Sequence, residues 1–137
     1  MKPTPKYRSD CPINYALETF GDKWSLLIIR DLMFQGKNNY SEFLKAEEKI
    51  STNILASRLE KLERAGLITK SIDPNNNAKK VYLLSEKGID LLPMLLEMMA
   101  WSAHYDEHTG CPVEFSNQLK EDKQSLITQL KRQLIES

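Results

Sequence analysis

The sequence predicts one mostly α-helical domain that carries a single small β-hairpin. Three observations lead to this fold class. Apolar residues recur at helical spacing over most of the chain, two short strand-like runs flank a turn rich in Pro and Asn, and residues typical of helix starts and stops separate the segments. The length of 137 residues and the hydrophobic fraction of 41% suit one soluble domain with a short appendage.

Composition excludes several classes of protein. No apolar run is long enough to span a membrane, and no apolar signal-peptide stretch follows the polar start of the chain, so we expect a cytoplasmic protein without a membrane partner. Two cysteines, Cys11 and Cys111, are too few for a disulfide framework and lack zinc spacing. His104 and His108 could form a metal-binding pair on one helix, but solvated histidines at a helix end are the stronger interpretation. We expect no metal and no cofactor.

Helical segments fill the first half of the chain. Pro12 suits a first helical turn, and Gly21 ends that helix. Asp22 can cap a second helix that runs to about Phe34. A third, short helix is expected after Asn39, because Glu42 three residues later completes a pattern that resembles a capping box.

The segment from Ile50 to Gly66 predicts the most informative helix. Ser51 is a good N-cap and Gly66 a good stop. Leucines at 55, 59 and 62 line one face. The opposite face is polar, and for this helix in isolation a solvated surface would be the better interpretation; that face carries Asn53, Ser57, Glu60, Lys61 and Arg64.

A hairpin and two further helical segments follow. Residues 67–72 and 81–84 read as two strands around a turn at 73–78, with Lys79 and Lys80 at the tip. Ser85 caps a long helix that contains Pro93, where it should kink or restart. After Gly110 one final amphipathic helix is expected, on the spacing of its leucines from Leu119 to Leu134.

The long helix is apolar over more of its circumference than one small core needs. It could simply cross the middle of the domain, but exposed apolar patches of this size usually mark interfaces, and we favour a second subunit as the partner. The expected dimer contacts come from this helix and from the first helix: Ile13, Leu17, Leu91, Leu95, Met98, Met99 and Trp101.

Two short helices with a turn, followed by a charged hairpin, are typical of the winged helix-turn-helix fold, in which the second helix of the pair enters the DNA major groove. The formal net charge is zero. Residues 50–84, however, hold six basic and three acidic side chains, whereas residues 85–115 hold one lysine and six acids. One part of the fold could therefore face phosphates while another repels them.

Several motifs resemble the HxlR-type family of bacterial winged-helix regulators, in that family's order from about Cys11 to Trp101. They are Cys11-Pro12, the run 21–28 (GDKWSLLI), the run 40–43 (YSEF), Ile50-Ser51 with Leu55, the run 59–68 (LEKLERAGLI) and the run 82–88 (YLLSEKG). The resemblance implies a homodimer built by the first and last long helices, recognition of a palindromic operator in double-stranded DNA, and control of transcription, most often repression. The domain plan is an N-terminal arm at 1–10, the winged domain with its dimerisation helices at 11–109, and a helical extension at 110–137 that exceeds the usual family length.

Two kinds of DNA contact are expected. Thr52, Asn53 and Ser57 are placed for base edges, and Ser51 can help the helix N-terminus to hold a phosphate. The expected contacts to the DNA backbone are Lys61 and Arg64 on the helix, Asn76, Lys79 and Lys80 on the wing, and Tyr40 and Ser41 on the preceding helix.

Cys11 is a candidate redox sensor, because in several members of the family a cysteine at this position senses oxidants or electrophiles. A small oxidant or electrophile is then the candidate inducer. The helix N-terminus favours a thiolate, although a small residue tucked against the first helix is an equally good interpretation. A disulfide to the partner's Cys111 requires the two Cα atoms to approach within about 7 Å.

Two rival functions remain open at this stage. A thiol redox enzyme acting through Cys11 would lack a CxxC pair, a nucleotide loop and any catalytic base, so no enzyme is expected. A winged-helix module that binds proteins instead of DNA is favoured by the neutral charge and opposed by the basic 50–84 segment. Retention on heparin that falls steeply with salt would separate this module from a DNA-binding protein.

Overall fold

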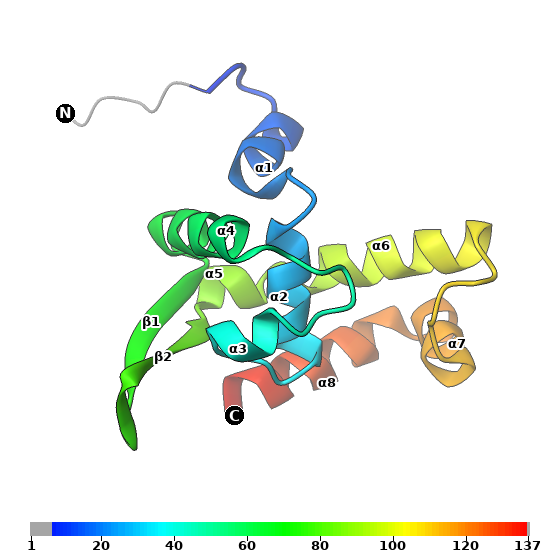
Figure 1. Ribbon diagram of the computed structural model, residues 1–137. Coiled ribbons are helices and arrows are strands. Elements are labelled where there is room, and N and C mark those ends of the chain that lie inside the picture. Colours follow the sequence, from blue (N-terminus) through cyan, green and yellow to red (C-terminus); the bar gives the residue numbers. More distant parts are fainter. Residues whose placement is uncertain (1–6, 137) are drawn as a thin grey trace. The chain divides into compact units, whose positions relative to one another are not determined.

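A computed structural model describes residues 7–136 of the chain (Figure 1). Residues 1–6 of the expected arm therefore lie outside the described residues. The elements are α1 (Pro12–Phe20), α2 (Ser25–Phe34), α3 (Tyr40–Phe43), α4 (Thr52–Arg64), β1 (Ile68–Asp73), β2 (Asn76–Leu84), α5 (Glu86–Ile89), α6 (Leu92–Tyr105), α7 (Val113–Glu121) and α8 (Lys123–Glu136). This order is that of the predicted winged helix.

The chain divides after Ser85 into an N-terminal part and a C-terminal part, which are described separately. The N-terminal part holds the helix-turn-helix pair and the hairpin. The predicted boundary at residue 110 stays a prediction.

The core of the N-terminal part forms where α2, α4 and the hairpin meet. The predicted stripe of α4 is buried, with Leu55, Leu59 and Leu62 at most 1% exposed. Ile28 and Ile29 of α2 are 3% and 0% exposed. Burial of such side chains contributes about 1.5–3 kcal/mol each, so this stripe fixes which face of α4 points outward.

Hydrogen bonds confirm the predicted starts of α3 and α4 and the predicted C-terminal end of α4. The Asn39 side chain accepts a hydrogen bond from the backbone N–H of Glu42, and Ser51 Oγ accepts one from the N–H of Ile54. At the other end of α4, Gly66 has a φ of 80°, and the N–H of Leu67 donates to the carbonyl of Leu62 at 3.0 Å. This is a Schellman ending, in which a glycine adopts the left-handed conformation that other residues avoid.

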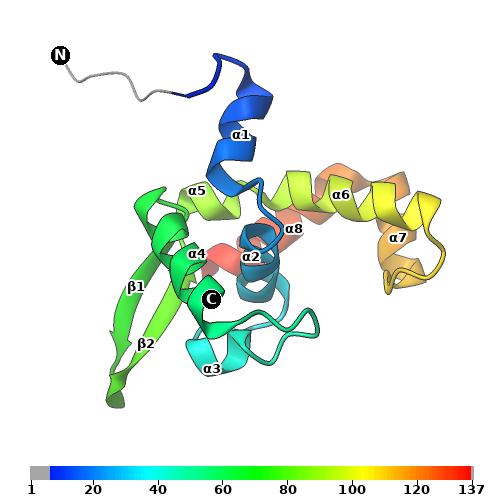
Figure 2. The same cartoon turned by 45° about the horizontal axis from the view of Figure 1, so that its top comes forward.

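The hairpin is longer than the sequence predicts. Strand β2 begins at Asn76 and not at Val81, and Asp73 pairs with Asn76, so the turn lies at residues 74 and 75. Lys79 and Lys80 therefore lie along β2 and not at the tip. The prediction was wrong because backbone pairing continues through polar residues, with a register shift beside Asp73 that absorbs the irregularity. Both Figure 1 and Figure 2 show the hairpin extending away from α2, α3 and α4 as a wing.

The expected long helix is interrupted before Pro93. Helix α5 ends at Ile89 and α6 restarts at Leu92, with Pro93 in its first turn, where a missing N–H is tolerated. The predicted restart is thus confirmed. Leu92, Leu95 and Leu96 are the buried residues of α6.

The segment after Gly110 forms two helices, where the sequence predicts one. Helix α7 ends before Asp122, whose φ of −150° is extended, and the Asp122 carboxylate accepts a hydrogen bond from the N–H of Ser125 and so begins α8. Leucine spacing did not reveal this break, because the apolar period resumes after it. Lys123 pairs with Glu97, and Lys131 Nζ lies 3.1 Å from Asp90, so α8 runs antiparallel to α6 within the C-terminal part.

Replacing Gly66 with alanine is expected to destabilise the fold. A left-handed conformation costs an L-residue about 1–2 kcal/mol, so Gly66→Ala should lower the free energy of unfolding by about this amount in urea titrations followed by circular dichroism. Gly110→Ala is the matched control, because a Cβ there meets nothing within 4 Å and its φ is not positive. Equal effects of the two substitutions would contradict the role assigned to Gly66.

Candidate nucleic-acid interface

Helix α4 carries all three residues predicted to contact base edges. The side chains of Thr52, Asn53 and Ser57 are exposed, and so are those of Ala56 and Glu60. Ala56 and Glu60 were not among the predicted contacts. Their place follows from the helical period, since each lies three or four residues from Asn53 or Ser57.

The turn before α4 is anchored to α2 by Arg30. Its guanidinium donates to both carboxylate oxygens of Glu48, at 2.6 and 2.9 Å, and to Asp31 at 2.8 Å. Asp31 is 2% exposed. The Arg30 guanidinium holds the pKa of the Glu48 carboxyl below its ordinary value. Lys49 follows with a φ of 58°, an unfavourable conformation for a non-glycine residue that this anchored turn imposes.

A single carboxylate joins the start of α2 to the flank of α4. Asp22 Oδ1 accepts hydrogen bonds from the N–H groups of Trp24 and Ser25, both at 2.9 Å, and Oδ2 accepts one from Ser25 Oγ at 2.6 Å. Arg58 Nε lies 3.0 Å from Oδ1, and Lys61 Nζ lies 3.6 Å from Oδ2. Asp22 thus accepts hydrogen bonds from the first backbone N–H groups, as predicted for a cap, although Trp24 and not Asp22 directly precedes α2. Its pairing with two cations of α4 was missed, because these residues lie more than thirty positions away in the sequence.

A groove lies between α3 and the wing. Its volume is about 480 Å³, and its lining contains all five residues predicted to contact the DNA backbone from these two elements. The lining consists of Asn39, Tyr40, Ser41, Asn76, Ala78, Lys79 and Lys80. Hydroxyl, amide and ammonium groups of this kind suit an anion such as phosphate.

Tyr82 fixes the wing beside α3. Its N–H donates to the carbonyl of Asn38 at 2.8 Å, and its ring lies 6.2 Å from Tyr40 and 6.3 Å from Phe43, centroid to centroid. Burial raises the pKa of Tyr82 to about 12. The groove is therefore formed by α3 and the wing, whose relative position is fixed by one backbone hydrogen bond and two ring contacts.

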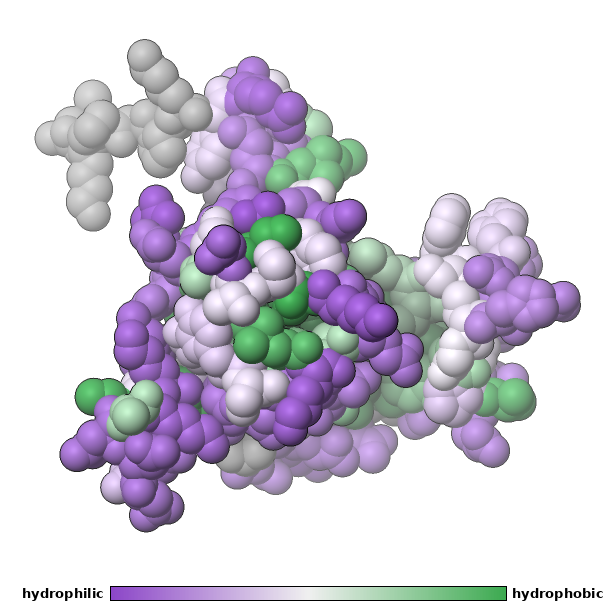
Figure 3. Space-filling model, in the orientation of Figure 1, coloured by the Kyte–Doolittle hydropathy of each residue, from purple (hydrophilic) through white to green (hydrophobic). Residues whose placement is uncertain are grey.

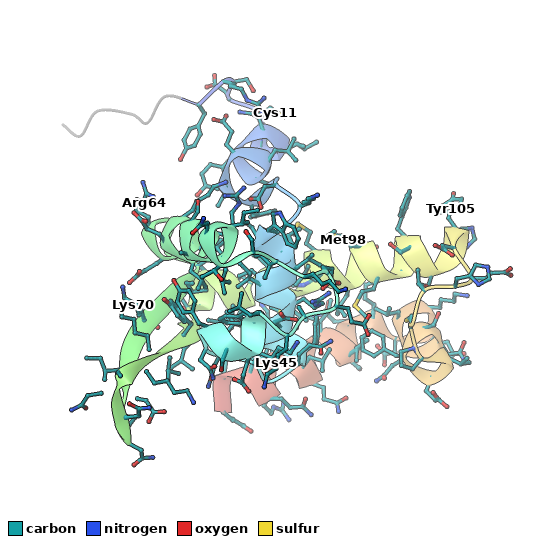
Figure 4. All side chains as sticks on the ribbon, in the orientation of Figure 1. Cys11, Lys45, Arg64, Lys70, Met98 and Tyr105 are labelled. Atoms are coloured by element: carbon teal, nitrogen blue, oxygen red, sulfur yellow. The ribbon has the colours of Figure 1, made fainter. Side chains whose placement is uncertain are left out.

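The basic residues of this part differ in their partners. Arg64 and Glu60 are both 73% exposed and lie 3.5 Å apart, a surface pair that contributes little. Lys70 pairs with Glu63 at 3.7 Å, and Lys79 lies 3.8 Å from Asp73. Figure 4 shows Arg64 and Lys70 projecting outward from α4 and β1, and Figure 3 shows a predominantly hydrophilic surface over the wing.

The start of α1 is exposed. Cys11 occupies the N-cap position, and its N–H donates to Ser9 Oγ at 3.3 Å (Figure 4). Its thiol is exposed, which does not fit the alternative of a small residue tucked against the helix. Ile13 and Leu17 are 71% and 53% exposed.

The predicted dimer residues of the C-terminal part differ in exposure. Met98 and Trp101 are 47% and 68% exposed. Leu91 and Met99 are half-buried, whereas Leu95 is buried and offers almost no surface to a partner. Cys111 is half-buried and follows α6 after a short loop.

Residues 7–136 contain neither a metal-binding cluster nor a membrane-spanning helix. No group of three or more His, Cys, Asp or Glu side chains in this range is arranged to hold a metal ion. No helix in the same range is both long and apolar enough to cross a membrane.

Residues 19–110 match the model of the HxlR-like helix-turn-helix family. The HTH-type transcriptional regulator sll1512 of Synechocystis is 31% identical over 101 residues, which are 74% of this chain and 74% of the relative. The HTH-type transcriptional regulator YodB of Bacillus subtilis is 34% identical over 98 residues, which are 71% of this chain and 87% of YodB.

Solved structures agree with these matches. The reduced form of YodB from B. subtilis is 30% identical, with a TM-score of 0.58 over 74% of this chain and 99% of that one. The redox regulator HypR in its oxidised form is 28% identical, with a TM-score of 0.61 over 69% of this chain and 96% of that one. A quinone-bound YodB structure also matches, at 30% identity and a TM-score of 0.57, over 69% of this chain and 99% of that one.

Proposed function

Because the chain belongs to the HxlR-like helix-turn-helix family of transcriptional regulators, we propose that it binds a palindromic DNA operator as a homodimer and represses transcription. The observation that carries the proposal is the exposed polar face of α4 beside the lysine-bearing groove. The relatives are named as regulators, which favours this function over a thiol enzyme.

The outward face of α4 suits the major groove. The Asn53 amide can donate to adenine N7 and accept from the adenine N6 amino group, and Ser57 lies one turn further along the same face. Ala56 offers a methyl group to thymine, and Glu60 can accept from cytosine N4. The exposed first turn of α4, capped by Ser51, leaves backbone N–H groups near the position of a phosphate.

The groove between α3 and the wing suits the flanking DNA backbone. Lys79 and Lys80 supply positive charge along β2, while Tyr40 and Ser41 supply hydroxyl donors from α3. Arg64 adds a cation at the end of α4. These contacts would set affinity and salt dependence without carrying sequence information. Lys61 would contribute only when its pair with Asp22 opens.

The exposed apolar residues support a homodimer. Ile13 and Leu17 on α1, and Met98 and Trp101 on α6, are the large apolar side chains of these predicted contacts that remain exposed. Each is worth about 1.5–3 kcal/mol when buried, so together they can hold a stable interface. A symmetric dimer presents its two recognition helices to two half-sites, which explains why a palindrome is expected.

The proposed function includes redox control of DNA binding through Cys11. Its thiol is exposed at the start of α1, and the similar structures include the redox regulator HypR in its oxidised form and a quinone-bound YodB. In a disulfide to the partner's Cys111, the two thiols lose two protons and two electrons to an oxidant such as diamide, which becomes a hydrazine. The bond would fix the dimer in one geometry and change the spacing of the recognition helices.

Substitutions should separate base contacts from phosphate contacts. Asn53→Ala or Ser57→Ala is expected to reduce the preference for DNA from upstream of the chain's own gene over random duplex, by about 1–3 kcal/mol for a bidentate contact. Lys79→Ala with Lys80→Ala should weaken binding to both duplexes and flatten the salt slope by about two units if Lys79 exchanges Asp73 for a phosphate in the complex. Fluorescence anisotropy between 50 and 200 mM salt (on the order of cellular ionic strength) measures both effects. Wild-type protein that binds neither duplex would favour the protein-interaction module.

The dimer should form without DNA. Sedimentation equilibrium at micromolar concentration is expected to give twice the chain mass of 15.8 kDa. Trp101→Glu should shift the equilibrium toward monomer, because it places a charge in the apolar interface. Val113→Glu is the matched control, since Val113 is 70% exposed and lies outside the predicted contacts. A wild-type monomer would refute the proposed dimer.

Oxidation should release DNA only when Cys11 is present. Diamide or a quinone is expected to abolish operator binding by the wild type and to leave Cys11→Ser active. Cys111→Ser should prevent the cross-linked dimer on a non-reducing gel. If all three proteins respond equally, Cys11 is not a sensor.

A further inference from the structure

We propose that Asp22 determines the specificity of the DNA interface by holding two cations of α4, Arg58 and Lys61, away from DNA phosphates. The inference rests on the proposed DNA binding by α4. It concerns a residue outside the interface itself, so Asp22 is a positioning residue that acts through its two partners.

Arg58 and Lys61 are close enough to the outward face of α4 to reach DNA if they were released. Lys61 lies one helical turn after Ser57 and thus on the same side of the helix. Arg58 Nη1 donates to Ser57 Oγ at 3.1 Å, so its guanidinium already borders the residues proposed to contact bases. A change of rotamer would turn either long side chain from Asp22 toward the DNA backbone.

The Asp22 carboxylate competes strongly with DNA phosphates for Arg58 and Lys61. Its side chain is only 21% exposed, and the N–H groups of Trp24 and Ser25 fix its orientation. Burial alone would raise the pKa of the carboxyl, but hydrogen bonds from Ser25, Trp24 and Arg58 outweigh this effect and hold it well below its ordinary value. The carboxylate therefore stays charged at neutral pH. Because its orientation is already fixed, pairing with Arg58 and Lys61 costs it little conformational entropy.

Holding the cations changes the balance between specific and non-specific binding. Each cation that meets a phosphate releases counterions and strengthens binding to any sequence. With Arg58 and Lys61 paired to Asp22, α4 presents to the DNA the uncharged Asn53 and Ser57, together with Arg64 and Glu60, which form a weak surface pair. Sequence then contributes a larger share of the total affinity.

Asp22→Asn in the full chain tests the proposal. The amide oxygen can still accept from the N–H groups of α2, but the charge that holds the cations is lost. Binding to a random-sequence duplex should become about tenfold tighter at low salt, and its salt slope should steepen by up to about two units, roughly 0.9 for each released cation. The preference for DNA from upstream of the chain's own gene should fall. Circular dichroism and thermal melting verify that the variant is folded.

Glu114→Gln is the matched control for net charge. It removes one exposed carboxylate from the C-terminal part and should leave the salt slope unchanged. An equal change in both variants would show that overall charge is responsible, and would overturn the role of Asp22.

Arg58→Gln gives a second test, and its measurement in the wild-type background does not depend on the folding of Asp22→Asn. In the wild-type background it should leave the salt slope for random duplex unchanged, because Arg58 is already paired. In the Asp22→Asn background it should flatten the slope by about one unit. A flattened slope in the wild-type background, or an unchanged slope in folded Asp22→Asn, would overturn the inference while leaving the proposed DNA binding intact. Wild-type protein that binds no DNA would overturn both.

Discussion

The docking of α4 through its leucine stripe is the constraint on which the proposed interface depends. Leu55, Leu59 and Leu62 are almost fully buried, so rotation of α4 by even one residue position would expose apolar surface and bury polar groups. The stripe therefore selects the outward residues, Asn53 and Ser57 among them, without contacting any of them. The Ser51 cap and the Gly66 ending set the limits of the helix, and the Arg30 anchor fixes the turn that leads into it.

Electrostatic pairs decide what the flanks of α4 can do. Hydrophobic burial determines the rotation of the helix but does not distinguish one long cation from another. Arg58 and Lys61 meet a partly buried carboxylate, whereas Arg64 has only a neighbouring glutamate on the surface. Fully exposed pairs are weak and readily exchange their partners for phosphate. Partly buried pairs with fixed hydrogen bonds exchange for phosphate less easily. Burial of the acidic partner therefore separates Arg58 and Lys61, which stay paired, from Arg64, which is available to DNA.

The features that the sequence predicted are those with a local cause. The leucine period of α4, the Ser51 cap and the Gly66 stop each depend on residues a few positions apart, and all three are present. The length of β2 and the break at Asp122 were missed, because strand pairing and a capping side chain can override apolar spacing. The second role of Asp22 joins residues that are distant in the sequence, and the groove beside α3 needs two such elements. Only the packed fold brings these together.

A chain of zero net charge can still present a surface for DNA, because pairing and not composition decides which charges are available. In the basic segment from residue 50 to 84, Lys61, Lys70 and Lys79 each lie near a carboxylate. Such a surface binds few phosphates at once and has low affinity for random DNA. Low non-specific affinity is useful to a regulator, since an operator competes with a great excess of other sites. The neutral charge, which at first favours a protein-binding module, is then equally consistent with a DNA-binding protein that relies on base contacts along α4.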